Sequence, residues 1–241
     1  MAETPLQEQV ALVTGASQGI GRAIAHRLAA LGATVVLTAR SRSRLQEVAA
    51  EIVREGGCAE VLPADVRSRA EVEALAGAVL ERYRRVDFLV NNAGMGQFGQ
   101  PLHLTPPEVW TATLDTNLSS VYYAVRALAP HFIQRRTGHI INIASLAGHN
   151  PLPGGAVYAA SKAALHGLSV SLAEELRAYN VRVSLVCPGS VDTELSSELV
   201  GNKDRSKMLR PEDVAHVVGM LATQGPRSFV SEVLIRPTLK P

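Results

Sequence analysis

Short apolar runs alternate with longer amphipathic stretches along the whole chain. Most of the short runs are apolar at successive positions, which is typical of strands covered on both faces of a sheet. The runs that we interpret as strands are Val10–Val13, Thr34–Thr38, Ala59–Leu62, Phe88–Val90, Ile140–Ile143, Val181–Val186 and Val230–Ile235. The stretches between them, such as Ile20–Leu31 and Arg42–Glu55, have a helical pattern. This alternation predicts an α/β fold with a doubly wound parallel sheet of seven strands and helices on both faces.

The composition fits one globular domain. Hydrophobic residues make up 46% of the chain and charged residues 19%. No linker, repeat or low-complexity tract divides the sequence, so we expect a single domain over residues 1–241. The net charge of +2 is too small to indicate nucleic-acid or membrane binding. No apolar run reaches membrane-spanning length, and the residues from Met1 to Pro5 lack the pattern of a signal peptide.

The two cysteines, Cys58 and Cys187, lie far apart without a Cys/His cluster around either. This spacing argues against a disulfide framework and against a Cys-based zinc site. The histidines show no metal-ligand spacing either, so we expect no metal site. The sparse cysteines fit a reducing compartment, and we expect a cytoplasmic protein.

A glycine-rich turn joins the first predicted strand to the first predicted helix, with the sequence Thr14-Gly-Ala-Ser-Gln-Gly-Ile-Gly21. Glycines let the backbone approach a pyrophosphate, whose charge is met by the N–H groups and dipole of the helix start. A plain tight turn is the alternative, but the flanking strand and helix favour a nucleotide. The residues that we expect to contact a dinucleotide here are Gly15, Ser17, Gln18, Gly19, Ile20 and Gly21.

Further motifs follow in order along the chain. They are Asn91-Asn92-Ala93-Gly94, Ser145, Tyr158-x-x-x-Lys162 and Pro188-Gly189. With the three-residue spacing between Gly15 and Gly19, these motifs resemble the short-chain dehydrogenase/reductase family, and in particular its short single-domain branch. The match runs from about Val10 to Thr193. The resemblance implies a Rossmann-like fold and an NAD(P)-dependent oxidoreductase that acts on a small-molecule ketone or alcohol.

Tyr158 and Lys162 are four residues apart in a strongly helical run, which places both side chains on one helix face. A tyrosine alone has a pKa near 10, and we expect the neighbouring ammonium to lower it toward the working range. Ser145 stands thirteen residues before the tyrosine and could hydrogen-bond a substrate oxygen. The resemblance implies that Asn117 holds a water that links Lys162 to solvent as a proton relay. The alternative is a core contact for the tyrosine, a solvated lysine, and local caps for the serine and asparagine.

The residues after the second predicted strand bear on the choice of cofactor. NAD enzymes usually place a carboxylate there for the ribose 2′-OH, whereas NADP enzymes place a cation for the 2′-phosphate. Here Thr38-Ala39-Arg40 ends without an acid, and Arg40 could clamp a phosphate. We therefore expect NADP(H) to be preferred over NAD(H). The alternative is a solvated arginine at the start of a charged helix.

Other cofactor contacts are implied by the resemblance. Asp65 and Val66 follow the third predicted strand, where relatives contact the adenine, although Asp65 could equally cap the next helix. Asn92, Ala93 and Gly94 follow the fourth predicted strand, at the switch point where such sheets bind ligands, and would approach the cofactor ribose.

Contacts to the nicotinamide are expected after the sixth predicted strand, at Pro188, Gly189, Val191 and Thr193. The substrate pocket is expected to include Met95, Leu146 and His149, although a loop histidine is more often simply solvated.

Residues 194–209 form a short polar segment at the place where relatives have a substrate lid. A short lid predicts an open pocket that accepts bulky or varied ketones. The C-terminus lacks the Asp-Gly-Gly turn that is common in the family, so the resemblance leaves a homodimer and a homotetramer open. A dimer through the helices that carry Asn117 and Tyr158 is the better supported part of this expectation.

Three functions are compatible with the motifs. The leading hypothesis is an NADPH-dependent carbonyl reductase, in which hydride passes to a ketone carbon and Tyr158 gives the proton. A 3-oxoacyl-[acyl-carrier-protein] reductase shares every motif and would need a basic patch for the acidic acyl carrier protein, with candidates at Arg135-Arg136 and Lys203–Lys207. A non-catalytic sensor that binds NADP and a protein partner is the third, and the presence of both Tyr158 and Lys162 argues against it.

Overall fold

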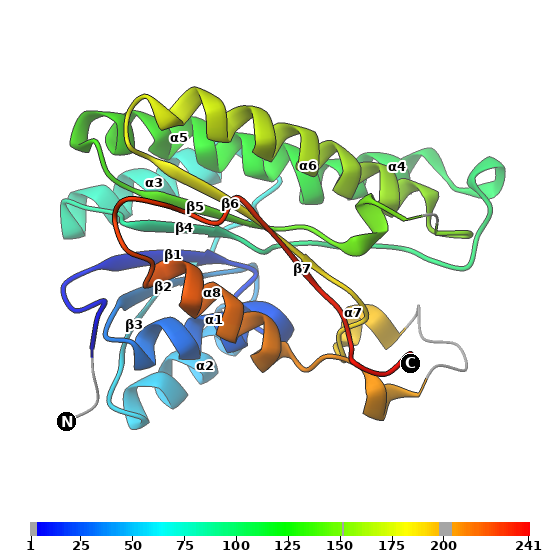
Figure 1. The fold of residues 1–241 in the computed structure, drawn as a ribbon, viewed down its shortest axis with the longest axis horizontal. Coiled ribbons are helices and arrows are strands. Elements are labelled where there is room, and N and C mark those ends of the chain that lie inside the picture. The colour runs from blue at the N-terminus through cyan, green and yellow to red at the C-terminus, as the bar shows by residue number, and fades with distance from the viewer. Residues whose placement is uncertain (1–3, 151, 198–203) are drawn as a thin grey trace.

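Seven parallel strands form one sheet in the order β3-β2-β1-β4-β5-β6-β7, shown in Figure 1. The computed structural model describes residues 4–150, 152–197 and 204–241. The strands are β1 (Val10–Thr14), β2 (Thr34–Thr38), β3 (Cys58–Val61), β4 (Phe88–Asn91), β5 (His139–Ile143), β6 (Arg182–Pro188) and β7 (Glu232–Ile235). Neighbouring strands pair in parallel throughout. The predicted α/β fold with a doubly wound seven-stranded sheet is therefore confirmed.

Helices cover both faces of the sheet because the strands are apolar on both faces. One face packs against α1 (Gly19–Ala30), α2 (Arg42–Arg54) and α8 (Pro211–Ala222). The other face packs against α3 (Arg69–Tyr83), α5 (Ser120–Arg135) and α6 (Ala156–Arg177). In β1, Ala11 and Val13 join the first of these two layers, whereas Val10 and Leu12 join the second. Alternate residues of a strand point to opposite faces, so each strand contributes to both cores.

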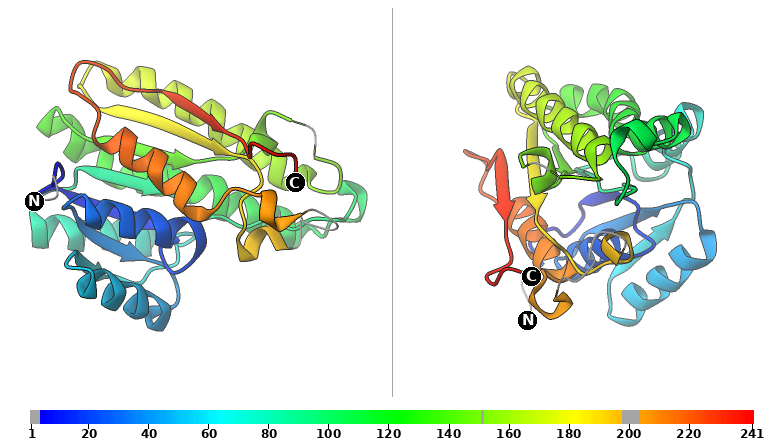
Figure 2. Two further views of the ribbon diagram at one scale, coloured as in Figure 1. Left: turned by 60° about the horizontal axis from the view of Figure 1, so that its bottom comes forward. Right: turned by 90° about the vertical axis from the view of Figure 1, so that its right-hand side faces the viewer.

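Shorter elements occupy the loops. They are η1 (Leu102–Leu104), α4 (Pro107–Leu114), the π-helical turn η2 (Asp115–Ser119), η3 (Leu146–Gly148), α7 (Glu194–Ser197) and η4 (Arg205–Lys207). Figure 1 shows α4 and α7 toward the same end of the molecule, and Figure 2 gives two further views of this end. Within the described ranges, no helix has both the length and the apolar character needed to cross a membrane.

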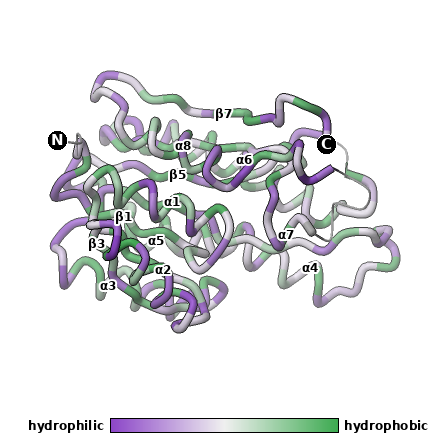
Figure 3. Tube along the Cα trace, turned by 90° about the horizontal axis from the view of Figure 1, so that it is seen from below, coloured by the Kyte–Doolittle hydropathy of each residue, from purple (hydrophilic) through white to green (hydrophobic). Residues whose placement is uncertain are grey.

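Six of the seven strands differ by one or two residues at one or both ends from the runs that the hydrophobic pattern predicts, and only β2 agrees at both ends. β3 begins one residue earlier, at Cys58, and β7 begins at Glu232 rather than at Val230. Val230 is held by side chains: its N–H donates to the side-chain oxygen of Gln224, and its carbonyl accepts from the hydroxyl of Ser184. The apolar character of Val230 therefore reflects packing and not strand pairing. Figure 3 shows β7 at the border of the molecule, beside α8.

The strand order reverses between β1 and β4. The chain continues from β1 to β2 on one side and from β4 to β5 on the other. Loops that leave the carboxyl ends of two such strands diverge, and the crevice between them is where sheets of this kind bind ligands. The glycine-rich turn and the Asn91–Gly94 motif both lie at this point, as the sequence predicts.

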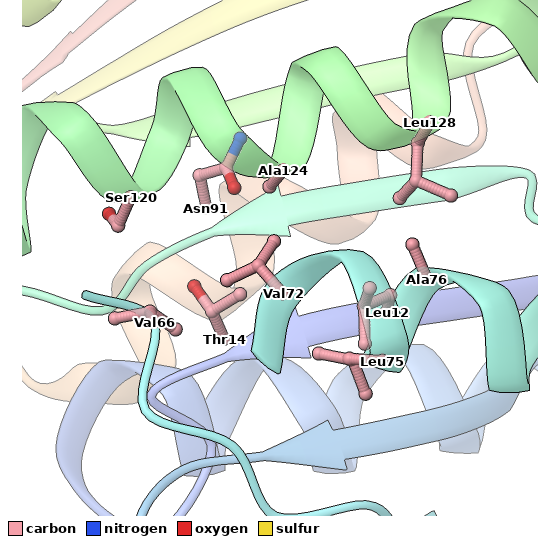
Figure 4. Close-up of a pocket in the computed structure, with 10 residues that line it drawn as sticks. All are labelled: Leu12, Thr14, Val66, Val72, Leu75, Ala76, Asn91, Ser120, Ala124 and Leu128. Carbon is pink, nitrogen blue, oxygen red and sulfur yellow. The ribbon is translucent and has the colours of Figure 1, made fainter. Parts of the chain in front are cut away.

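A small gap lies beneath the crevice, between β1, β4, α3 and α5 (Figure 4). It encloses about 10 Å³ and is lined mainly by apolar side chains such as Leu12, Val72 and Leu128. Thr14 and Asn91 contribute polar atoms to it. A space of this size holds at most about one water molecule, so the gap belongs to the packing of the core and not to a substrate site.

At the opposite end of the sheet, Asp87 joins the starts of β1 and β4. Its carboxylate accepts from the Val10 N–H at 2.8 Å and pairs with Arg85 at 2.8 Å and Arg135 at 3.1 Å. Burial by itself raises the pKa of this carboxyl, but the bonds from Arg85 and Val10 outweigh burial, and the net pKa lies below its ordinary value. The ionised carboxylate therefore stabilises the folded state above about pH 4. This stabilisation is lost as the pH falls through the lowered pKa.

We expect Asp87→Asn to lower the free energy of unfolding at pH 7 by about 2 kcal/mol, because two guanidinium groups lose their buried partner. For a chain of this length, that corresponds to a fall in Tm of roughly 4–8 °C. The difference between variant and wild type should shrink below pH 4. Glu73→Gln, which breaks an exposed pair with Arg69, is the control and should shift the Tm by less than about 2 °C. Thermal unfolding followed at pH 7, 5 and 3.5 measures both effects. An equal fall in Tm in the two variants would contradict the role of Asp87.

Candidate active site

The glycine-rich turn leaves β1 at Thr14 and enters α1 at Gly19. Gly15 and Gly19 have φ values of +64° and +53°, a backbone conformation that favours glycine. Gly21 is required for a different reason, because a Cβ atom there would lie 2.2 Å from the Gly15 carbonyl oxygen. The N-cap residue Gln18 makes no side-chain capping bond. The N–H groups at the start of α1 are thus left for an anionic group such as a phosphate.

The hydroxyl of Thr14 ties the glycine-rich turn to the loop after β4. It accepts from the N–H groups of Asn92 and Ala93, at 2.9 and 3.0 Å, and donates to the Val90 carbonyl at 3.3 Å. The Asn92 side chain in turn donates to the Thr14 carbonyl at 2.9 Å and the Gly15 carbonyl at 3.3 Å. These bonds fix the two sides of the crevice relative to each other.

A cavity of about 1030 Å³ opens between these loops. Its volume is at the upper end of the range for small-molecule and cofactor sites, about 300–1,000 Å³. The predicted site residues that line it are Gly15, Ser17, Gln18, Gly19, Ile20, Arg40, Asp65, Val66, Asn92, Ala93, Gly94, Met95, Tyr158, Lys162 and Thr193. A Cβ atom at Gly94 would stand 3.5 Å from Asn117 Oδ1 and 3.6 Å from Lys162 Nζ, which is ordinary van der Waals contact, so packing within the chain does not itself require glycine there. The glycine cradle, the free helix start and the volume together fit a dinucleotide.

Tyr158 and Lys162 lie on α6, both largely buried, on the wall of this cavity. Lys162 Nζ stands 5.8 Å from the centre of the Tyr158 ring and donates to the Ile143 carbonyl at 2.9 Å. Burial lowers the pKa of Lys162 to about 8. Burial also raises the pKa of Tyr158, opposed by a hydrogen bond from Ser145. The expected lowering of the tyrosine pKa by Lys162 is thus not met, because burial dominates and the ammonium is bonded to a carbonyl.

Ser145 has two roles in the structure. Its hydroxyl accepts from the Ala147 N–H at 3.1 Å, which caps η3, and it also hydrogen-bonds the phenol of Tyr158. The sequence analysis gives a local cap as the alternative role of Ser145. The structure shows this cap, and it also shows a contact of Ser145 with Tyr158. A substrate oxygen bound by both hydroxyls would meet two hydrogen-bonding groups at one point.

Asn117 lies in the π-helical turn η2 and is 1% exposed. Its side-chain oxygen accepts from the Met95 N–H, and its side-chain nitrogen donates to the Met95 carbonyl, both at 2.8 Å. The same nitrogen donates to the Ser161 hydroxyl at 2.9 Å. Both N–H donors of the amide are therefore used, so a relay water would have to bind the remaining lone pair of the oxygen or the backbone. The side chain holds the loop after β4 against α6, and its part in a proton relay stays a prediction.

Asp65 forms a close pair with Arg67, with 2.6 Å between Oδ2 and Nη2. The cap of α3 is Ser68, whose hydroxyl accepts from the Glu71 N–H, so the alternative that Asp65 caps this helix is wrong. The hydrogen bond from Arg67 lowers the pKa of the Asp65 carboxyl, and the charge of Arg40 adds to this lowering. The negative charge of Asp65 is therefore balanced by cations on the same wall of the cavity.

Other predicted residues lie outside the lining of the cavity. They are Gly21, Asn117, Ser145, Leu146, His149, Pro188, Gly189 and Val191. His149 lies against β7, with its Nε2 3.0 Å from Glu232 Oε1. That His149 contacts a substrate stays a prediction, and its position against β7 does not favour it.

The basic pair Arg135-Arg136 lies at the wrong end of the sheet for a patch at the pocket mouth. Arg135 pairs with Asp87, which immediately precedes β4, whereas the cavity opens where β4 ends. Of the second candidate patch, Lys203 lies outside the described residues, Arg205 lines the cavity and pairs with Asp192, and Lys207 pairs with Asp204 in its own segment.

The expected lid at residues 194–209 is folded at both of its described ends, as α7 and η4, and residues 198–203 lie outside the description. Arg205 pairs with Asp192 across this segment. Leu209 is anchored on both sides, because its N–H donates to the Ser190 carbonyl at 2.9 Å and its carbonyl accepts from the Asp192 N–H at 2.8 Å. The segment is thus held close to the loop after β6.

The sequence analysis missed several residues that the fold adds to the cavity. They include Ser41, Arg44, Arg67, Thr116 and Asp192. Ser41 follows Arg40 directly and Arg44 lies three residues further on, so the charge at this helix start is an available signal. Phe98 was also missed: its ring packs edge-on against Tyr158, with 5.1 Å between ring centres. Nothing local in the sequence around Phe98 indicates this contact.

Comparisons with known proteins agree with this geometry. Residues 9–204 match the family described as short chain dehydrogenase. A curated uncharacterized oxidoreductase of Staphylococcus saprophyticus is 39% identical over 233 residues, which cover 96% of this chain and 98% of that protein. An uncharacterized oxidoreductase of Staphylococcus epidermidis is 35% identical over 232 residues, with the same coverage of each chain.

Solved structures are similar over nearly the whole chain. A metagenomic short-chain oxidoreductase in complex with NADP is 51% identical, with a TM-score of 0.87, and the match covers 98% of this chain and 100% of that one. A short-chain type dehydrogenase/reductase from Mycobacterium marinum is 32% identical, with a TM-score of 0.90, and the match covers 96% and 95% of the two chains.

We expect Gly21→Ala to lower the Tm and to weaken nucleotide binding by about tenfold or more, because its Cβ would displace the Gly15 carbonyl and the Asn92 side chain. Gly77→Ala is the matched control, since a Cβ at Gly77 on the exposed side of α3 meets nothing within 4 Å. The control should keep or raise the Tm, because alanine is the better helix former. Thermal unfolding and NADPH titration test both variants. Normal NADPH affinity in Gly21→Ala would show that the close approach does not matter.

Proposed function

The chain belongs to the short-chain dehydrogenase family, and on this premise we propose that it is an NADPH-dependent carbonyl reductase that reduces small-molecule ketones to alcohols. The observation that carries the proposal is the buried Tyr158 phenol, hydrogen-bonded by Ser145 and close to Lys162, at the cavity beside the glycine-rich turn. These groups bind and protonate an oxygen, which is the part of the reaction that the protein itself must supply.

The raised pKa of Tyr158 suits the direction of reduction. A phenol with a pKa above its ordinary value is fully protonated at neutral pH, so it has a proton to give to the oxygen of a ketone. Ser145 holds that oxygen, and the Lys162 ammonium stands near enough to stabilise the phenolate that remains. When bound, the reduced nicotinamide supplies the hydride.

The proposed cofactor is NADPH in preference to NADH. Arg40 and Arg44 flank Ser41 at the start of α2, on the cavity wall, and Asp65 is neutralised by Arg67. This arrangement offers cations and a helix start to a 2′-phosphate, which would compete for Arg44 with the Glu194 carboxylate at 3.9 Å. The complex of the 51% identical metagenomic relative with NADP supports the same choice.

The same cavity supports broad use of ketones as substrates. It is large, and its described wall near the lid includes the side chains of Met95 and Leu195. A 3-oxoacyl-[acyl-carrier-protein] reductase remains the alternative. Its candidate pair Arg135-Arg136 is remote from the cavity, and in the described part of Lys203–Lys207 the residue that lines the cavity, Arg205, is paired with Asp192.

We also propose a cytoplasmic homodimer that associates through α5 and α6. Both helices carry large apolar side chains that are about half exposed in the single chain, Tyr122 at 50% and Val170 at 51%. The two cysteines, Cys58 and Cys187, are both free thiols, which fits a reducing compartment.

We expect Arg40→Glu to lower the ratio of kcat/KM for NADPH to that for NADH by about 10–100-fold, because a carboxylate repels the 2′-phosphate and accepts from a ribose hydroxyl. Arg42→Glu is the charge-matched control: it lies two residues further on, is exposed, and does not line the cavity. Steady-state kinetics with both cofactors measure the ratio. An unchanged ratio in Arg40→Glu, or an equal fall in Arg42→Glu, would contradict the assignment.

We expect the wild type to oxidise NADPH with a panel of bulky and small ketones that includes a 3-oxoacyl thioester. Tyr158→Phe should lower kcat by about 10²–10⁴-fold, because the proton donor is lost, while the Kd for NADPH stays within about twofold. Absorbance of NADPH follows turnover, and fluorescence titration gives the Kd. A strong preference for the thioester would favour the carrier-protein reductase. NADPH binding without turnover of any ketone would favour the sensor.

A further inference from the structure

Three side chains with metal-binding chemistry meet beside the end of β6. His149 follows η3, Cys187 is near the end of β6, and Glu232 begins β7. His149 Nε2 lies 3.0 Å from Glu232 Oε1, and Cys187 Sγ lies 3.7 Å from each of these two atoms. One imidazole nitrogen, one thiol sulfur and one carboxylate oxygen therefore converge on a common point.

The spacing of these donor atoms matches a tetrahedral zinc site. With Zn–S near 2.3 Å and Zn–N or Zn–O near 2.0–2.2 Å, neighbouring donor atoms stand about 3.3–3.6 Å apart. The observed separations of 3.0–3.7 Å bracket these values, so little movement is needed to admit an ion. Sulfur, imidazole and carboxylate together are a donor set typical of Zn²⁺, whereas Mg²⁺ and Ca²⁺ prefer oxygen alone.

We propose that His149, Cys187 and Glu232 bind one zinc ion per chain. Binding displaces the proton of the Cys187 thiol, which leaves to solvent, so that the sulfur coordinates as a thiolate. The fourth position is taken by water or by a further side chain. This site borders the proposed reductase machinery, because the Cys187 thiol lies close enough to Lys162 for each group to affect the pKa of the other. Its test does not depend on turnover.

The surroundings support a metal at this point. The Cys187 side chain is fully buried, whereas the His149 and Glu232 side chains are 31% and 34% exposed, which gives an ion a path from solvent. Burial and the nearby Glu232 carboxylate raise the pKa of the Cys187 thiol to about 12, which disfavours the thiolate before a metal binds, whereas a hydrogen bond from the Ser145 backbone and the charge of Lys162 act to lower it. A bound cation would offset the repulsion between the thiolate and the carboxylate.

His166 forms the outer support of the site. It lies on α6, its Nε2 approaches Glu232 Oε1 at 3.4 Å, and its ring stands edge-on to that of His149, with 4.8 Å between ring centres. Such outer partners orient a metal-binding carboxylate, and their loss typically weakens metal affinity by about 10–100-fold.

The proposed zinc would join three segments that the hydrogen bonds of the sheet connect only in part. It would tie the loop after Ser145 to β6 and to β7, the last strand of the sheet. Because Cys187 immediately precedes Pro188, the metal would also fix the start of the loop expected to hold the nicotinamide. Its role is therefore structural, and it touches no reacting atom.

Cobalt(II) titration of the full-length protein, stripped with a chelator, tests the proposal. Four-coordinate cobalt bound by a thiolate gives a sulfur-to-metal absorption in the near ultraviolet and intense visible bands. We expect both with the wild type, saturating at about one ion per chain, and displacement of the cobalt by one equivalent of Zn²⁺. We also expect Zn²⁺ to raise the Tm of the wild type.

The variants identify the ligands. Cys187→Ser should abolish the sulfur-to-metal band, and His149→Asn, a change at a partly exposed side chain that spares the core, should lower cobalt affinity by more than about 100-fold. His166→Gln should lower it by about tenfold. Cys58→Ser is the control, since Cys58 is the other free cysteine and is exposed, and this variant should bind cobalt like the wild type.

Two results would overturn the proposal. A wild type that gives no sulfur-to-cobalt band, and retains no zinc after desalting, would show that the three residues form only a hydrogen-bonded cluster. A band that disappears in Cys58→Ser and persists in His149→Asn would assign metal binding to the surface thiol.

Discussion

The buried hydroxyl of Thr14 holds together the two loops that diverge from the reversal point of the sheet. Parallel strands deliver the glycine-rich turn and the Asn91–Gly94 loop to the same edge, but strand pairing ends where the loops begin. By accepting from two N–H groups and donating to a carbonyl, Thr14 continues the connection beyond the last strand pair. The cradle for a dinucleotide depends on this bond set, because glycines that give access also remove rigidity.

Burial sets the chemistry on the opposite wall of the cavity. It lowers the pKa of Lys162 to about 8 and raises that of Tyr158, so each group is pushed toward its neutral form. A neutral phenol can donate its proton. A neutral lysine, however, could not stabilise the phenolate that remains after proton transfer. The two demands are compatible only below the pKa of Lys162, where the ammonium and the phenol coexist. The Asn117 amide positions this wall by bonding Met95 and Ser161 at once.

The sequence predicts those features that are local and periodic. Continuous apolar runs identify the seven strands, and the helical spacing of Tyr158 and Lys162 places them on one face. It does not reveal how residues from distant segments meet. His149, Cys187 and Glu232 come together only because β7 pairs with β6, and Arg135 is remote from the cavity only because α5 runs back to the start of β4. The predicted shift of the Tyr158 pKa is wrong in direction, because the spacing of two residues along a helix does not show how deeply they are buried.

The sheet and the segment after β6 make separate contributions to the cavity. The residues proposed to act on an oxygen belong to α6 and to the loop after β5, which are fixed by strand pairing and by buried bonds. The wall beyond Thr193 depends instead on backbone bonds between Asp192 and Leu209, the Asp192–Arg205 pair, and the bond from the Gly189 N–H to the Ile235 carbonyl. We therefore expect selectivity for a substrate to depend on residues 194–197 and 204–209, where a change leaves the proposed reacting groups and the expected nicotinamide contacts in place. Replacing these residues alone should keep the oxidoreductase chemistry and alter the substrate that is accepted.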